Sequence, residues 1–255
     1  MHRQGPTFLI AGAPRSGTTW LYHLLDRHPD VYMAKPVRPE PKFFLVDELY
    51  ERGFQHYVDT WFDGADAYAA AGEKTTNYLE SARAAERIHR HLPDVKLVFI
   101  LREPAQRAYS NWAWSRMNRM ETLDFATALE QEDERERMVP SHLRYARPHA
   151  YFSRGLYATL LRPYLDLFRR DQVLCLKFEE IILKPSELAC RLHRFLGVAP
   201  RPDDTLGLEV VNPSEAGDAM SDDMRRRLRR RYAPATRELV ALLGPEFADW
   251  IPDEQ

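Results

Sequence analysis

Two glycines separated by four residues mark the segment of the chain that is best suited to chemistry. Gly12 and Gly17 follow an apolar run, and the hydroxyl residues Thr18 and Thr19 come directly after them. Glycine lets backbone amides approach phosphate oxygens closely, and the N-terminus of a following helix adds partial positive charge and free N–H donors. The segment therefore predicts a phosphate-binding loop between a strand and a helix.

The charges around this loop argue against a magnesium-dependent nucleotidase. A Walker-type loop has lysine after its second glycine, but Thr18 stands there and the cation lies inside the loop, at Arg15. Such enzymes also hold magnesium with an aspartate that follows an apolar strand. Here the most apolar run ends in Leu101 and Arg102, and arginine binds anions. A sulfuryl group carries less negative charge than a terminal phosphoryl group, so we predict transfer chemistry that relies on fixed cations and needs no metal ion.

The same two segments resemble the donor site of the sulfotransferases that use 3′-phosphoadenosine 5′-phosphosulfate (PAPS). Pro14 to Leu21 is similar to the family's 5′-phosphosulfate loop, and Leu101 to Ser110 is similar to its 3′-phosphate motif, in which an arginine and a serine eight residues later bind the 3′-phosphate. The resemblance extends from Phe8 to Gly197. It implies that PAPS is the donor, that 3′,5′-ADP (PAP) is the product and that no metal takes part. The cofactor-binding residues that it implies are Arg15, Ser16, Gly17, Thr18, Thr19, Trp20, Arg102 and Ser110.

Two further segments resemble stretches of bacterial and carbohydrate sulfotransferases and supply the catalytic candidates. Glu40 to Phe44 is similar to a Lys-Glu-Pro-x-Phe-Phe stretch, and Glu73 to Tyr78 is similar to a Glu-Lys-Thr-Pro-x-Tyr stretch. We expect Glu40 to act as the general base, and Lys74 to contact the reacting group or to orient Glu40. Arg15 is expected to stabilise the charge that builds on the leaving phosphate.

The chain departs from the family pattern at three points. Pro39 stands where the family usually has lysine, and the residues that could replace that charge are Lys35, Arg38 and Lys42. The C-terminal Lys-Gly-Arg cofactor loop of the heparan-type enzymes has no match, so the region 211–220 replaces it or adenosine binds differently. Some relatives with phenolic acceptors use histidine as the base, which leaves His23, His28 and His56 as alternatives to Glu40.

The expected elements place these residues at one edge of a parallel sheet. Short apolar runs predict strands, and the longer periodic segments between them predict helices. The expected strands are residues 7–11, 31–34, 67–72, 95–101 and 172–177. The expected helices are residues 18–27, the second half of 43–62, 81–91, 104–120, 124–137, 154–168, 185–196 and 221–243. Alternating strands and helices predict a single α/β domain over residues 1–255, with a P-loop-like parallel sheet covered on both faces, and ligands of such sheets bind at the carboxyl ends of the strands.

The composition indicates a globular protein that must build its anion site locally. Hydrophobic residues make up 44% and charged residues 29%, and the formal net charge is −2, so no excess of positive charge indicates a nucleic-acid partner. Cys175 and Cys190 lack metal-ligand spacing and are expected to be buried thiols of a cytoplasmic protein. Neither a signal peptide nor a membrane span is expected.

These observations lead to one hypothesis and two alternatives. The hypothesis is in-line transfer of a sulfuryl group from PAPS to a hydroxyl, and less readily to an amine, of a small-molecule, natural-product or carbohydrate acceptor. A P-loop kinase or nucleotidase would need lysine after Gly17 and an acidic metal ligand. In a non-catalytic nucleotide-binding protein, Glu40 and Lys74 would have no catalytic role. The acceptor stays open, and so does the oligomeric state, for which a homodimer is one option.

Overall fold

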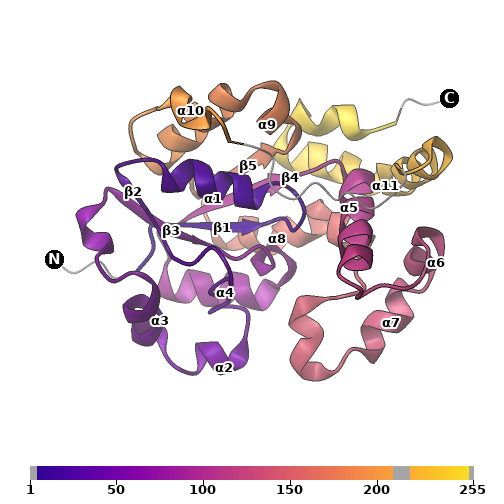
Figure 1. Ribbon diagram of the computed structural model, residues 1–255, viewed down its shortest axis with the longest axis horizontal. Coiled ribbons are helices and arrows are strands. Elements are labelled where there is room, and N and C mark those ends of the chain that lie inside the picture. The colour runs from indigo at the N-terminus through magenta and orange to yellow at the C-terminus, as the bar shows by residue number, and fades with distance from the viewer. Residues whose placement is uncertain (1–4, 209–218, 253–255) are drawn as a thin grey trace. The chain divides into compact units, whose positions relative to one another are not determined.

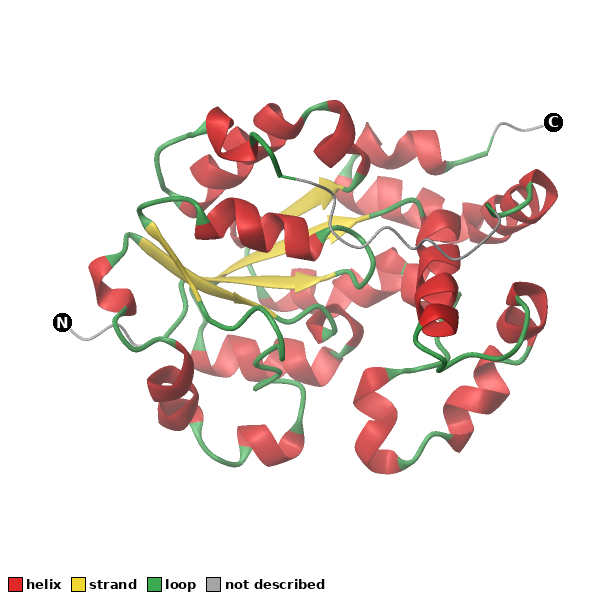
Figure 2. Ribbon diagram, in the orientation of Figure 1, coloured by secondary structure: helices red, strands yellow, loops and turns green. Residues whose placement is uncertain are grey.

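The computed structural model describes residues 5–208 and 219–252, and the chain divides into two compact units. The first unit comprises Met1–Leu101 and Pro163–Val211, and the second comprises Arg102–Arg162 and Asn212–Gln255. The first contains a parallel sheet between helices, and the second is helical (Figures 1 and 2). The region 211–220, a candidate for the missing C-terminal cofactor loop, lies outside the described residues except for its last two positions.

Five parallel strands form the sheet of the first unit, in the spatial order β2-β3-β1-β4-β5. The strands are β1 (Phe8–Gly12), β2 (Val31–Met33), β3 (Ala70–Lys74), β4 (Lys96–Leu101) and β5 (Val173–Lys177). All of β1 and all but the first residue of β4 are buried, as expected for apolar strands that helices cover on both faces. The predicted α/β class with a parallel sheet is therefore confirmed.

One predicted strand lies too early in the chain. Residues 67–72 were expected to be extended, but Ala65–Ala67 forms a 3-10 helix (η1) and the strand covers Ala70–Lys74. Alanine and glycine have little strand propensity, so pairing with the neighbouring strands decides where this one begins and ends. In that register Lys74 lies opposite Ile10 of β1 and becomes the last residue of β3.

Helices cover both faces of this sheet. On one face lie α1 (Thr18–Asp26) and α10 (Pro185–Leu196), and on the other lies α4 (Ala82–His91) (Figure 1). Alternate residues of β4 face the two layers, because Val98 and Ile100 join the apolar cluster with α1 and α10, whereas Phe99 contacts Tyr164 with ring centroids 5.1 Å apart. The remaining helices of the unit are α2 (Asp47–Tyr50), α3 (Phe54–Trp61), α9 (Glu179–Leu183), η2 (Tyr78–Glu80), η5 (Arg170–Gln172) and η6 (Pro202–Thr205). Helix α8 (Tyr157–Leu167) contributes residues to both units.

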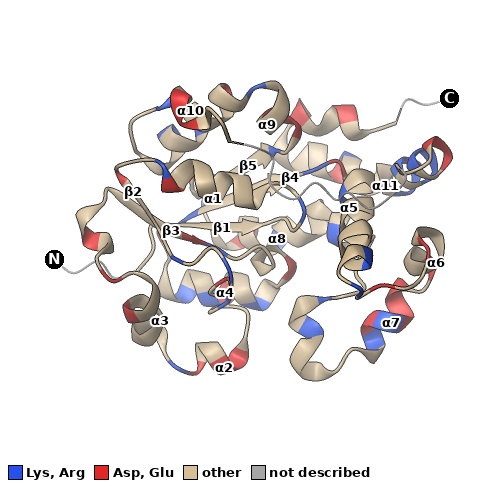
Figure 3. Ribbon diagram, in the orientation of Figure 1, with Lys and Arg blue, Asp and Glu red and all other residues tan. Residues whose placement is uncertain are grey.

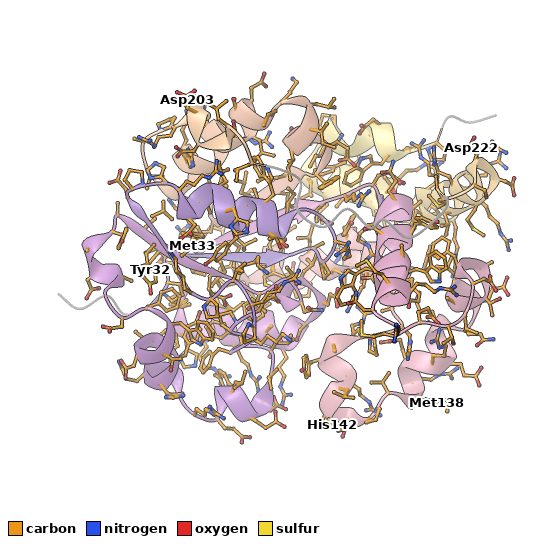
Figure 4. The ribbon with its side chains drawn as sticks, viewed as in Figure 1. Tyr32, Met33, Met138, His142, Asp203 and Asp222 are labelled. Carbon is orange, nitrogen blue, oxygen red and sulfur yellow. The ribbon has the colours of Figure 1, made fainter. Side chains whose placement is uncertain are left out.

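The two edge strands are less completely covered than the centre of the sheet. On β2, Met33 is buried in the apolar cluster, whereas the adjacent Tyr32 is half-buried and contacts Tyr68 (Figure 4). Cys175 on β5 and Cys190 on α10 are thiols outside any disulfide and are only half-buried, so the expectation of two fully buried thiols is wrong. An edge strand has a neighbour on one side only, and Cys175 remains partly accessible for that reason.

The second unit contains four α-helices and three 3-10 helices among its described residues. They are α5 (Pro104–Met117), α6 (Phe125–Glu130), α7 (Glu132–Met138), α11 (Asp222–Leu243), η3 (Ser141–Ala146), η4 (Ser153–Gly155) and η7 (Pro245–Trp250). Arginines gather on the first half of α11 (Figure 3). No helix within residues 5–208 and 219–252 combines the length and the apolar character that crossing a membrane requires.

The single helix predicted over residues 124–137 is interrupted. Gln131 ends α6, and α7 begins at the next residue. The carboxylate of Glu132 is buried and accepts hydrogen bonds from the backbone N–H groups of Tyr151, Phe152 and Ser153 at 3.0, 2.5 and 2.9 Å. This tertiary contact fixes the break, and the local helical pattern contains no sign of it.

Candidate active site

The predicted phosphate loop connects the end of β1 to the start of α1. Gly17 is the N-cap of α1 in the left-handed conformation, with φ 90°, and no side chain caps the helix. The first N–H groups of a helix have no carbonyl partner within it, so those of Thr18, Thr19 and Trp20 are available to an anion. The Ala13 N–H donates to the Ile100 carbonyl at 2.8 Å, which attaches the loop to β4.

The side chains of the loop differ in what they can offer an anion. Arg15 and Thr19 are half-buried, and Thr18 is buried at the first position of the helix. The buried Ser16 hydroxyl has no hydrogen-bond partner among the described residues, which leaves a donor for a bound oxygen. The indole of Trp20 is buried in the apolar cluster of the first unit, and its backbone N–H lies in the first turn of α1.

We expect Gly17→Ala to destabilise the protein, because the position has both a left-handed backbone and no room for a methyl group. A Cβ atom built there would lie 2.6 Å from Ile181 Cδ1 and 2.9 Å from Phe178 Cδ2. Gly64→Ala is a matched control, since Gly64 has the same backbone class, with φ 76°, but a Cβ atom at that position would meet no described atom within 4 Å. Urea unfolding should show a loss of about 1 kcal/mol for the control and roughly 1–3 kcal/mol more for Gly17→Ala. Equal losses would show that close packing at Gly17 is unimportant.

Glu40 and Lys74, which are far apart in the sequence, form an ion pair beside this loop. The Lys74 Nζ donates to Glu40 Oε1, and the Lys74 and Glu40 side chains are 2% and 13% exposed. The backbone N–H of Thr76 also donates to Glu40 Oε2 at 3.2 Å, and the Thr76 hydroxyl lies 3.3 Å from the same oxygen. The expectation that Lys74 orients Glu40 therefore agrees with the contacts of both residues.

Pairing of β1 with β3 brings this ion pair to the carboxyl ends of the strands, where the loop follows β1. The N–H of Thr75 donates to the Ile10 carbonyl at 3.1 Å, so the chain beyond β3 runs beside the end of β1. A Cβ atom on Gly12 would lie 3.3 Å from the Thr76 carbonyl oxygen and 2.7 Å from Leu79 Cβ. A residue larger than glycine at the start of the loop would thus push against the segment that holds Glu40.

Glu73 belongs to this site and had no role in the sequence-based prediction. It is fully buried and accepts hydrogen bonds from the hydroxyls of Thr75 at 2.8 Å and Tyr57 at 3.4 Å. Burial raises the pKa of Glu73 to about 7, and the nearby charge of Glu40 acts in the same direction. Two signals in the sequence pointed to it: an acidic residue beside alanines and glycine in a short strand, and its place at the start of the stretch from Glu73 to Tyr78 that resembles the family.

Arg102 and Ser110 belong to the second unit and lie on the segment that begins α5. Arg102 directly follows the last residue of β4, and its carbonyl accepts a hydrogen bond from the Tyr157 hydroxyl at 2.8 Å. Glu103 caps the helix by accepting from the N–H groups of Ala105 and Gln106 at 3.2 and 2.8 Å. Arg102 is half-buried, and Ser110 is buried in the second turn of the helix.

The structure also describes the alternative candidates for the base and for the missing lysine. The ring nitrogens of His28 are bound to the Ala199 carbonyl and to the Asp30 N–H, at 2.9 and 3.1 Å, so this histidine serves the fold. His23 is half-buried on α1, and His56 is exposed on α3. Lys35 pairs with Asp26 at 3.1 Å, which makes it a poor replacement for the lysine missing at Pro39.

One buried group of residues has metal-ligand chemistry but hydrogen bonds that suit a structural role. His28, His193 and Asp204 offer ligand atoms within 4.8 Å of one another. A metal-bound histidine normally donates its second ring N–H, yet His193 Nδ1 accepts the N–H of Arg201 at 3.2 Å. The Asp204 carboxylate is paired with Arg201 at 3.1 Å. Burial lowers the pKa of His193 to about 4, so the ring is neutral at pH 7 and packs edge-on against His28.

Comparison with known proteins places this chain in a family. The Sulfotransferase domain family matches residues 6–210, so the chain belongs to the sulfotransferases. Human heparan sulfate glucosamine 3-O-sulfotransferase 6 is 27% identical over 266 residues, which cover 96% of this chain and 74% of that protein. Human bifunctional heparan sulfate N-deacetylase/N-sulfotransferase 3 is 27% identical over 203 residues, covering 76% of this chain and 22% of that protein.

Solved structures show the same fold. A sulfotransferase from Alicyclobacillus acidocaldarius is 29% identical, with a TM-score of 0.78, and the match covers 98% of this chain and 99% of that one. A mouse sulfotransferase is 15% identical, with a TM-score of 0.56 and coverage of 92% and 86%, and shares the fold. The resemblance predicted from the loops is therefore confirmed at the level of the family.

Proposed function

We propose that this protein transfers a sulfuryl group from PAPS to a hydroxyl of a carbohydrate or small-molecule acceptor, with an amine as the second candidate group. The main observation behind the proposal is the ion pair of Glu40 and Lys74. It lies at the carboxyl ends of β1 and β3, next to the predicted phosphate loop. Membership of the sulfotransferase family supports it, and so does the arginine that stands directly after β4 in place of an acidic residue. Both argue against a magnesium-dependent kinase.

The loop offers the groups that the 5′-phosphosulfate end of PAPS would need. The N–H groups at the start of α1, the unpartnered Ser16 hydroxyl and Arg15 would hold its oxygens. PAPS supplies the sulfuryl group when bound, and 3′,5′-ADP leaves. The same N–H groups and the Arg15 guanidinium stabilise the negative charge that develops on the phosphate oxygen as its bond to sulfur breaks.

Glu40 would accept the proton of the acceptor hydroxyl while the hydroxyl oxygen forms its bond to sulfur. Its carboxylate is held from two sides by Lys74 and Thr76, which limits its rotation and orients its free lone pairs. Lys74 is nearly inaccessible to water and places a positive charge at the site. We assign the remaining anion-binding role, recognition of the 3′-phosphate, to Arg102 and Ser110, because arginine binds phosphate through two parallel hydrogen bonds.

The relatives guide the choice of acceptor and of compartment. The names of two of them specify heparan sulfate, one as a 3-O-sulfotransferase and one as an N-sulfotransferase. We therefore favour a carbohydrate among the acceptor classes. We favour a hydroxyl over an amine because the match to the 3-O-sulfotransferase covers 96% of this chain and the match to the N-sulfotransferase 76%. The family match includes residues of both units, which supports one sulfotransferase domain over residues 1–255. The two cysteines, which form no disulfide, support a reducing compartment, and we propose the cytoplasm.

Titration with 3′,5′-ADP, followed by an assay of sulfuryl transfer from labelled PAPS with and without acceptors, tests this function. The proposal predicts binding of 3′,5′-ADP and, with one of the acceptors, faster formation of 3′,5′-ADP from PAPS together with a labelled sulfate ester of that acceptor. Binding of 3′,5′-ADP without any turnover of PAPS would identify a non-catalytic nucleotide-binding protein. Turnover of ATP without binding of 3′,5′-ADP would identify a kinase or nucleotidase.

A further inference from the structure

The hydroxyl of Thr75 connects a buried carboxylate to the loop that bears Glu40. The Thr75 hydroxyl donates to Glu73 Oε2 at 2.8 Å, and its oxygen accepts the backbone N–H of Lys42 at 3.1 Å. A hydroxyl has one hydrogen and two lone pairs, so donation to Glu73 directs a lone pair toward Lys42. The result is a directed chain of hydrogen bonds from Lys42 through Thr75 to Glu73.

The Glu73 end of this chain is rigidly anchored. Glu73 lies in β3, which pairs with β1 on one side and with β2 on the other. Its second carboxylate oxygen accepts from the hydroxyl of Tyr57, and the Tyr57 ring is fully buried and stacks on Phe43 with centroids 4.5 Å apart. Burial and the nearby charge of Glu40 both raise the pKa of Glu73. Keeping this carboxyl group inside the protein therefore costs considerable free energy.

The Lys42 end of the chain is a backbone position that needs support. Lys42 has φ 52°, a left-handed conformation that costs a residue with a Cβ atom about 1 kcal/mol or more. Its carbonyl accepts the N–H groups of Leu45 and Val46 at 3.0 and 3.1 Å, so its conformation sets the course of the following turn. Glu40 lies two residues earlier on the same segment. A change in the Lys42 backbone would therefore move the carboxylate of Glu40.

We propose that Thr75 and Glu73 are positioning residues for Glu40, acting through the Lys42 backbone. The inference rests on the proposed function, because it takes Glu40 as the base. Residues 73–76 then hold the base at two points. Lys74 and Thr76 contact its carboxylate directly, while Glu73 and Thr75 fix the backbone that carries it.

Thr75→Val removes the hydroxyl and keeps the shape of the side chain. We expect kcat to fall about tenfold, the effect of roughly one hydrogen bond, while the Kd of 3′,5′-ADP stays within about twofold. Hydrogen exchange at the Lys42 amide should become faster in the same variant. Thr75→Ser restores the hydroxyl and should recover both kcat and the protection of Lys42. Thr60→Val, which removes an exposed hydroxyl on α3, is the matched control.

The outcomes separate this role from a structural one and from failure of the proposed function. Unchanged kcat in Thr75→Val with faster exchange at Lys42 would overturn the positioning role. Unchanged exchange at Lys42, or a loss of 3′,5′-ADP binding in step with kcat, would overturn it as well. If the wild-type protein transfers no sulfuryl group, the base assignment fails and this role fails with it. That case is recognised because the exchange of Lys42 would still respond to Thr75→Val.

Discussion

Glu40→Gln should lower kcat by about 10²- to 10⁴-fold, the usual worth of a positioned general base, and leave the affinity for 3′,5′-ADP nearly unchanged. Glutamine has the size of glutamate, and its amide oxygen can still accept from Lys74 or from the Thr76 N–H, which donate to different carboxylate oxygens of Glu40. It cannot accept the proton of the acceptor hydroxyl. The loop that we assign to the phosphosulfate lies on α1 and β1, so its hydrogen bonds do not depend on this carboxylate.

Steady-state kinetics with saturating PAPS, together with calorimetric titration of 3′,5′-ADP, measures the two quantities separately. Glu48→Gln is the matched control, because Glu48 is exposed on α2 and should leave both quantities unchanged. Near-normal kcat in Glu40→Gln would mean that another group takes the proton, and the half-buried His23 would then be the next residue to test.

Arg102→Met should weaken binding of 3′,5′-ADP by about 10- to 100-fold and leave the affinity for adenosine 5′-monophosphate unchanged. This loss of affinity corresponds to one hydrogen bond between charged groups, which contributes about 1.5–3 kcal/mol to binding. Only the first of these nucleotides has the 3′-phosphate that we assign to Arg102. Methionine keeps most of the length and the apolar stem of arginine, and the hydrogen bond from Tyr157 reaches the Arg102 carbonyl, which the substitution retains.

Each variant is titrated with both nucleotides, and the two changes in affinity are compared. A general loss of folding would weaken the binding of 3′,5′-ADP and of adenosine 5′-monophosphate alike. Arg90→Met, at an exposed position of α4, is the matched control and should change neither affinity. Ser110→Ala should weaken 3′,5′-ADP alone and by less than Arg102→Met, because a neutral hydroxyl contributes about 0.5–1.5 kcal/mol. Equal losses for the two nucleotides in Arg102→Met would contradict the 3′-phosphate assignment.

The parts of the site that could be predicted from the sequence are those whose chemistry is local. Gly12 and Gly17 flank the loop between β1 and α1 as expected, because glycine spacing, an apolar strand and a helix start all lie within one short segment. Trp20 is a cofactor-binding candidate on the same segment, and its side chain is buried in the apolar cluster. Trp20 lies at a helical position whose side chain faces the sheet, and the local sequence does not distinguish this from exposure to a ligand.

The contacts among distant residues depended on strand pairing. The ion pair of Glu40 with Lys74, and the chain from Lys42 through Thr75 to Glu73, exist because β3 pairs beside β1 with Lys74 opposite Ile10. The sequence placed that strand too early, because its alanines and glycine have weak preferences of their own. For the same reason it assigned no role to Glu73.

The sequence by itself determined the α/β class, the position of the loop between β1 and α1 and the sulfotransferase family, because each rests on residue types at short, fixed spacings. Only the tertiary structure decided that Glu40 is held by Lys74 and Thr76, and that Glu73 is a buried carboxyl group beneath them. The physical reason is that hydrogen bonds and burial depend on which segments pack together, and the register of β3 against β1 brings these segments into contact.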